Sequence, residues 1–164
     1  MKKLIYIFVI LLSTSLFSSC KDKEDNGPDY RDEMVGEYEY EAIYTEIQQD
    51  LGYSGRDKST VSFEKKESSS IQLVDKETDD QLCSLTNFRK VGNKIVFDIP
   101  TQEIILDGDK LSATGYNNIS VSGNSYQGMY DIDKKELQFG ITFGFVGVRG
   151  YNHTYLYDVT AKKK

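Results

Sequence analysis

The strongest constraint on this chain is a series of short segments in which side chains alternate in character, separated by turn-forming residues. The clearest segment, residues 136–146, carries a bulky apolar side chain at every second position. These side chains are Leu137, Phe139, Ile141, Phe143 and Phe145. A period of two residues places them on one face of a β-strand, so this segment is predicted to cross the centre of a core.

Similar patterns predict strands along most of the remaining chain. They cover residues 36–47, 60–65, 69–74, 82–88, 94–99, 101–106, 111–122 with a bulge at 115–117, 125–132 and 151–160. Pro100 makes 101–106 either a kinked continuation or an edge strand. Residues 48–58 contain Gly52 and Gly55 and are predicted to form a long loop that acts as a lid.

Composition agrees with an all-β domain. The chain has 12 Tyr and 8 Phe but only 2 Pro, and aromatic side chains fit a pleated surface. Short turns between consecutive strands predict an antiparallel up-and-down meander of about eight to ten strands. Closure into a barrel removes exposed strand edges. We therefore predict a closed or nearly closed β-barrel, with a β-sandwich as the alternative.

The first residues have the features of an export signal. Lys2 and Lys3 precede an apolar run at residues 4–12, which is shorter than the roughly 20 residues that span a bilayer. Residues 16–20, Leu-Phe-Ser-Ser-Cys, resemble a bacterial lipobox. The resemblance implies that 1–19 is a lipoprotein signal peptide and that Cys20 is acylated. An ordinary cleaved signal peptide is the alternative.

Residues 20–34 are predicted to be the lipidated cysteine and a flexible charged tether. The run Lys21-Asp22-Lys23-Glu24-Asp25 resembles the export tag of surface lipoproteins of Bacteroidetes. This resemblance implies an outer-membrane protein whose domain faces either the periplasm or the cell surface. The membrane is thus a predicted partner, through the lipid anchor.

Residues 35–161 are predicted to form one domain of roughly 130 residues. The formal net charge is −6, and removal of a signal peptide containing Lys2 and Lys3 would make it more negative. An acidic domain is repelled by phosphate backbones, so nucleic acid is excluded as a partner. If Cys20 is lipidated, Cys83 is the one remaining thiol and no intramolecular disulfide can form.

Gly36-Glu37-Tyr38 on the first strand, together with the meander and the chain length, resembles the lipocalin-like, or calycin-like, lipoproteins of Bacteroidetes. Lipocalins carry Gly-x-Trp there, and Tyr38 replaces the Trp. The segment 93–102, Asn-Lys-Ile-Val-Phe-Asp-Ile-Pro-Thr-Gln, also resembles part of these proteins. The resemblance covers residues 35–161 and implies a barrel with a hydrophobic ligand site, but no catalytic residue.

The sequence predicts no enzyme and no cofactor. A Cys/His pair would require Cys83 and His153 to meet, and each is more simply interpreted as a structural residue. No cluster has the ligands that zinc needs. The acidic pairs Asp107/Asp109 and Asp131/Asp133 lack the pattern of a calcium loop and are interpreted as turns.

Tyrosines of the first and last strands, together with Phe143 of the segment 136–146, are the candidate ligand-binding residues. The candidates are Tyr38, Tyr40, Tyr44, Phe143, Tyr151 and Tyr155. If a barrel closes, these strands become neighbours, and tyrosines can stack on a ligand and hydrogen-bond it. The first hypothesis is a barrel that binds a small apolar or amphipathic molecule. The alternative is a filled barrel that acts as an interaction or accessory module of an envelope complex.

Overall fold

The structure described here is a computed structural model of the chain. It describes residues 29–48, 51–67, 69–106, 108–146 and 152–164. The predicted signal peptide, the lipidation site at Cys20 and most of the predicted tether lie outside the described residues. Within the described ranges, no helix is long and apolar enough to cross a membrane.

The described residues form twelve strands and one short helix. The elements are α2 (Arg31–Met34), β1 (Gly36–Gln48), β2 (Leu51–Lys66), β3 (Ser70–Asp75), β4 (Gln81–Val91), β5 (Lys94–Asp98), β6 (Gln102–Leu106), β7 (Asp109–Gly115), β8 (Ile119–Val121), β9 (Asn124–Tyr126), β10 (Gly128–Asp131), β11 (Glu136–Val146) and β12 (Asn152–Lys163). Among the consecutive strands, β2 pairs with β3 and β4 pairs with β5 as antiparallel hairpins.

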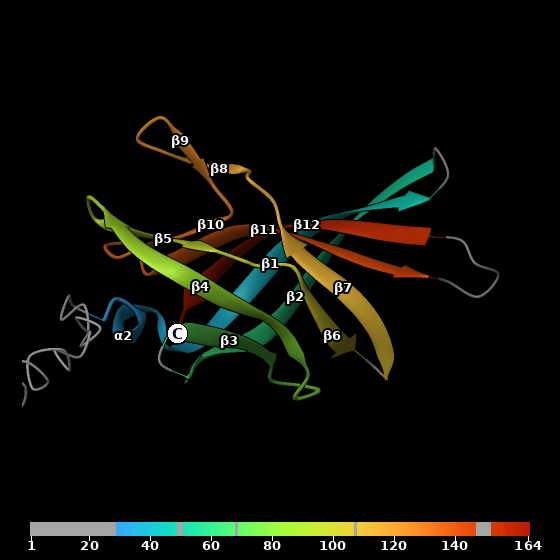
Figure 1. Ribbon diagram of the computed structural model, residues 1–164, viewed down its shortest axis with the longest axis horizontal. Coiled ribbons are helices and arrows are strands. Elements are labelled where there is room, and N and C mark those ends of the chain that lie inside the picture. Colours follow the sequence, from blue (N-terminus) through green and yellow to red (C-terminus); the bar gives the residue numbers. More distant parts are fainter. Residues whose placement is uncertain (1–28, 49–50, 68, 107, 147–151) are drawn as a thin grey trace, which may run out of the picture.

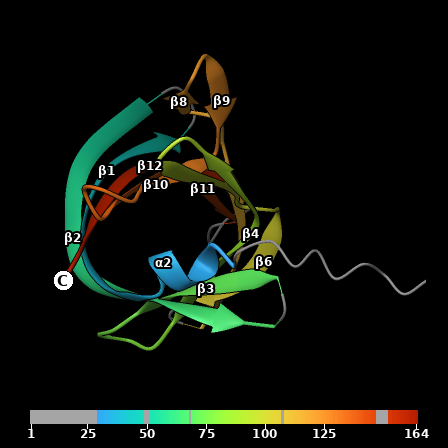
Figure 2. The same ribbon diagram turned by 90° about the vertical axis from the view of Figure 1, so that its left-hand side faces the viewer.

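Eight of the strands form a hydrogen-bonded ring. Their order is β10, β5, β4, β3, β2, β1, β12 and β11, and the ring closes because β10 also pairs with β11. The first and last strands are neighbours, with a ladder from Tyr38↔Lys163 to Ile47↔Thr154. Figure 1 shows the barrel from the side and Figure 2 looks into the ring. The predicted antiparallel, nearly closed barrel is confirmed, and the sandwich is excluded.

The hairpin β6–β7 departs from the order of a simple meander. The first part of β11, residues 136–139, pairs with β10, and residues 141–144 pair with β7. One end of the barrel wall is therefore built by β5 and β10, and the other by β6 and β7. Strands β8 and β9 form a separate two-stranded sheet, which projects from the barrel in Figure 1.

The prediction of a single bulged strand over 111–122 is wrong, because β7 and β8 belong to different sheets. The strand ends at Gly115, where the backbone comes very close to the chain after β5. The N–H of Gly115 donates to the Ile99 carbonyl at 3.0 Å, and a Cβ on Gly115 would lie 2.7 Å from the Cβ of Ile99. Only glycine fits this approach.

The prediction of a lid loop at 48–58 is also wrong, because these residues belong largely to β2. The β1–β2 ladder continues from Gly36↔Phe63 to Gln48↔Leu51. Gly55 serves packing in this strand, since a Cβ there would lie 2.4 Å from the ring carbon Cζ of Tyr44. An aromatic ring that covers a glycine stabilises a strand, although glycine alone favours a loop.

The short helix α2 lies at one mouth of the ring (Figure 2). Met34 at its end is fully buried, and its carbonyl accepts a 2.7 Å hydrogen bond from the Tyr38 hydroxyl. Asp29 before the helix forms ion pairs with Arg31 and Lys65, at 2.8 Å each. Residues 29–34, assigned to the tether by the sequence prediction, therefore pack against the barrel and close this end.

Candidate ligand pocket

A pocket of about 360 Å³ lies inside the barrel, further from α2 than the buried Tyr38. Strand β11 contributes Phe139, Ile141 and Phe143 to the apolar lining, and β3, β4, β6 and β7 each add a leucine. The alternation predicted for residues 136–146 explains this wall, since every second side chain points inward. The volume lies within the range of pockets that bind small molecules.

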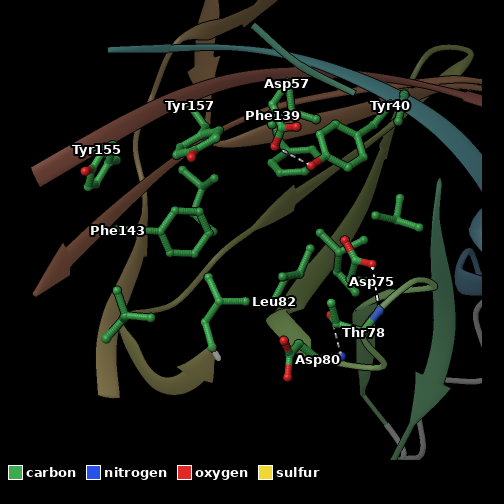
Figure 3. A pocket seen from close by; sticks show the side chains of 17 residues that line it. Tyr40, Asp57, Asp75, Thr78, Asp80, Leu82, Phe139, Phe143, Tyr155 and Tyr157 are labelled. Carbon is green, nitrogen blue, oxygen red and sulfur yellow. Dashed lines mark hydrogen bonds between the residues drawn. The ribbon is translucent and has the colours of Figure 1, made fainter. Parts of the chain in front are cut away.

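Aromatic rings pack on one another along one side of this pocket (Figure 3). Tyr157 of β12 contacts Phe143 edge to face, with ring centroids 5.5 Å apart, and stacks on Tyr44 of β1 at the same separation. Burial, followed by the charge of Asp57, raises the pKa of Tyr157 to about 12. Its hydroxyl is therefore neutral and able to donate a hydrogen bond at physiological pH.

Tyr40 and Asp57 form the first polar part of the wall. The Tyr40 hydroxyl donates to Oδ2 of Asp57 at 2.8 Å, as the dashed line in Figure 3 shows. Asp57 stands opposite the small Ala42 in the β1–β2 ladder, which leaves space for the longer Tyr40 to reach it. Burial and the bond to Asp57 both raise the pKa of Tyr40, so the tyrosine is the donor of this pair.

The turn between β3 and β4 supplies the second polar part, Asp75, Thr78 and Asp80. Oδ1 of Asp75 accepts the backbone N–H groups of Glu77 at 2.7 Å and Thr78 at 3.3 Å. The Thr78 hydroxyl in turn accepts the N–H of Asp80 at 3.3 Å. These bonds fix the turn beside the pocket.

A side chain, rather than a strand ladder, joins β4 to β6 at the edge of the pocket. Oε1 of Gln102 accepts the Ser84 N–H at 2.7 Å, and Nε2 donates to the Ser84 carbonyl at 3.2 Å. Nε2 also donates to the Pro100 carbonyl at 3.0 Å. One amide thus offers Ser84 the acceptor and donor that a neighbouring strand would supply. We call this contact the Gln102 seam.

The candidate residues from the sequence occupy three kinds of position. Tyr40, Phe143 and Tyr155 line the pocket. Tyr38 is buried beside α2, and Tyr44 stacks on the ring of Tyr157. Neither is among the lining residues. The sixth candidate, Tyr151, lies outside the described residues. Sequence reasoning missed the three aspartates, although an inward Asp57 follows from the alternation of β2 once that strand is extended.

Cys83 and His153 have separate environments. The Cys83 thiol is fully buried, and burial raises its pKa to about 12, which is the opposite of what a nucleophilic thiolate requires. His153 places Nδ1 3.1 Å from Oε1 of Glu46. Among the described residues, no group of three or more His, Cys, Asp or Glu side chains is arranged to hold a metal ion.

No protein-family model matches this chain, and comparisons with curated proteins and with solved structures find no similar protein.

Proposed function

We propose that this protein is a lipid-anchored outer-membrane protein whose barrel binds a small apolar or amphipathic molecule. The observation that carries the proposal is the pocket of about 360 Å³ inside the barrel, with its apolar and aromatic lining. A filled barrel, as expected of a pure interaction module, would have side chains in this space. The pocket therefore favours ligand binding over the alternative of an accessory module.

The geometry of the wall supports an amphipathic ligand. Phe143, Leu82 and their apolar neighbours would cover a hydrocarbon part, while Tyr40 and Asp57 present polar atoms to a head group. Each methylene of a ligand buried against such a surface contributes about 0.8 kcal/mol. A resemblance to lipocalin-like lipoproteins remains part of the proposal and rests on the motif at residues 36–38.

Ligand binding is tested with an uncharged naphthalene dye whose emission rises in apolar surroundings. The full chain is titrated with the dye, without detergent, because a detergent alkyl chain would compete for the pocket. Leu82→Trp would fill the pocket, since Leu82 points into it in Figure 3. Ile105→Trp is the matched control, because Ile105 on β6 is 58% exposed.

We expect saturable binding to the unmodified chain and to Ile105→Trp, and at least about tenfold weaker binding to Leu82→Trp. Equal binding to all three proteins would place the dye elsewhere and argue against the pocket. No binding to any of them would refute the proposed function.

The anchor is tested separately by cell fractionation. Cys20→Ala should move the protein out of the membrane fraction, because the acylated residue is lost. Cys83→Ala is the control, since it removes a thiol at a position that no acyl chain can reach while it is buried. Membrane retention of Cys20→Ala would refute the lipid anchor and leave the pocket proposal intact.

A further inference from the structure

The polar part of the pocket wall is acidic. Asp57, Asp75 and Asp80 line the pocket, and the residues described there include no Lys, Arg or His. In Figure 3 Asp75 and Asp80 lie across the pocket from Phe143 and Tyr155, and Asp57 lies beside Tyr40 and Phe139. The pocket thus combines an apolar, aromatic side with a carboxylate side.

The two cations that flank Asp57 in the sequence point away from this wall. Arg56 and Lys58 flank Asp57 in β2, and alternation places both on the outer face of the barrel. There they approach Glu41, with N to O distances of 3.7 and 3.5 Å. Among the described residues, the hydrogen-bond donor to Asp57 is the neutral hydroxyl of Tyr40.

The other two carboxylates also lack a cationic partner among the described residues. Asp75 accepts two backbone N–H groups of its own turn and a 3.4 Å contact from the Ser59 hydroxyl. These neutral donors orient the carboxylate but leave its charge uncompensated. A cation entering the pocket would therefore meet half-buried carboxylates whose negative charge attracts it.

From this arrangement we propose that the molecule bound in the pocket is an organic cation, an apolar chain or ring that carries an ammonium group. The inference rests on the proposed function and names its ligand class. The ammonium group would lie beside Asp57 and Asp75, where the face of an aromatic ring such as Tyr157 adds cation–π attraction. The apolar part would lie against Phe143 and Leu82. An inorganic cation fits less well, because no described group of side chains is arranged as a metal site.

The test compares three probes with the same alkyl chain: decyltrimethylammonium, decanol and decyl sulfate. Each displaces the uncharged dye from the full chain, at concentrations below micelle formation. We expect decyltrimethylammonium to bind at least about tenfold more tightly than decanol. Decyl sulfate should bind at least about tenfold more weakly than decanol, because like charges repel across the pocket.

Asp57→Asn tests the role of the carboxylate, since the amide oxygen can still accept the bond from Tyr40. It should reduce the preference for decyltrimethylammonium over decanol at least about fivefold. Glu37→Gln is the control, because it removes the same charge from an exposed position on the outer face of β1. It should keep the full preference.

Equal affinities of the unmodified chain for the three probes would overturn the organic-cation inference while the proposed function stands. Failure of all three to displace a dye that still binds in the pocket would also overturn the inference, whereas the absence of dye binding itself refutes the proposed function. The order of the three probe affinities for the unmodified chain decides the inference even if Asp57→Asn does not fold.

Discussion

Replacement of Gln102 by alanine tests whether the Gln102 seam holds the pocket end of the barrel together. The substitution removes two hydrogen bonds to Ser84 and one to the Pro100 carbonyl. It also leaves the N–H and carbonyl of Ser84 without their partner from β6. No strand ladder between β4 and β6 takes over among the described residues.

The loss of free energy of unfolding follows from these three hydrogen bonds. Each contributes about 0.5–1.5 kcal/mol net, and the bond to Pro100 is exposed and belongs at the low end of this range. Water can reach part of the opened seam and replace some of the lost bonds. We expect the free energy of unfolding to fall by about 1–3 kcal/mol, which corresponds to a drop of roughly 1 M in the urea midpoint.

Urea unfolding and amide hydrogen exchange measure this effect. The Ser84 amide should lose its protection in Gln102→Ala, while amides of the β1–β12 ladder keep theirs. Gln138→Ala is the control, because its bond to Glu136 at 2.7 Å links neighbours on one strand and closes no seam. A stability loss below about 0.5 kcal/mol with Ser84 still protected would show that side-chain packing, and not Gln102, holds β6 to β4.

Three further predictions concern the core. Gly128→Ala should lower the free energy of unfolding by about 1–3 kcal/mol, because the new Cβ would lie 2.2 Å from Cε2 of Phe97. Gly144→Ala is the control and should be close to neutral, since the nearest atom to its new Cβ lies 4.0 Å away. Equal urea midpoints of the two variants would contradict this prediction. Burial raises the pKa of Tyr38 above its unfolded value of about 10, so the stabilising contribution of the neutral Tyr38 is complete below that pH and is lost as the pH rises further. The urea midpoint should therefore decline above about pH 10. A midpoint that does not change up to about pH 11 would refute this prediction. Cys83 should resist alkylation in the folded chain and react on unfolding, as read by peptide mass mapping, and rapid modification under native conditions would show that it is accessible.

The parts of the fold that depend on local pattern are predictable from the sequence. Strand β11 follows from five alternating bulky residues, and the β4–β5 hairpin from the turn at Gly92 and Asn93. The edge position of β6 is one of the two alternatives that Pro100 indicates, because proline cannot donate to a ladder. In each case the physical cause lies within a few residues of the element.

The parts that depend on distant neighbours were not predictable in this way. Gly55 indicates a loop until the ring of Tyr44 is placed over it. Because its segment was assigned to a loop, Asp57 was not recognised as an inward-facing residue. It shares the inward face with Val61 and Phe63 once β2 is continuous. Gln102 has no local signature at all, since its role depends on the backbone of Ser84.

The ladder between β1 and β12 has a consequence for how the protein is made. It joins Tyr38 to Lys163, so the ring cannot close before β12 has been synthesised. Until then β1 and β11 each present an unpaired edge, and such edges promote association with other chains. A chain that ends early, before β12, would lack the strand that separates these two edges. Synthesis of the barrel is therefore complete only at its final strand, and premature termination yields an aggregation-prone open sheet rather than a smaller folded protein.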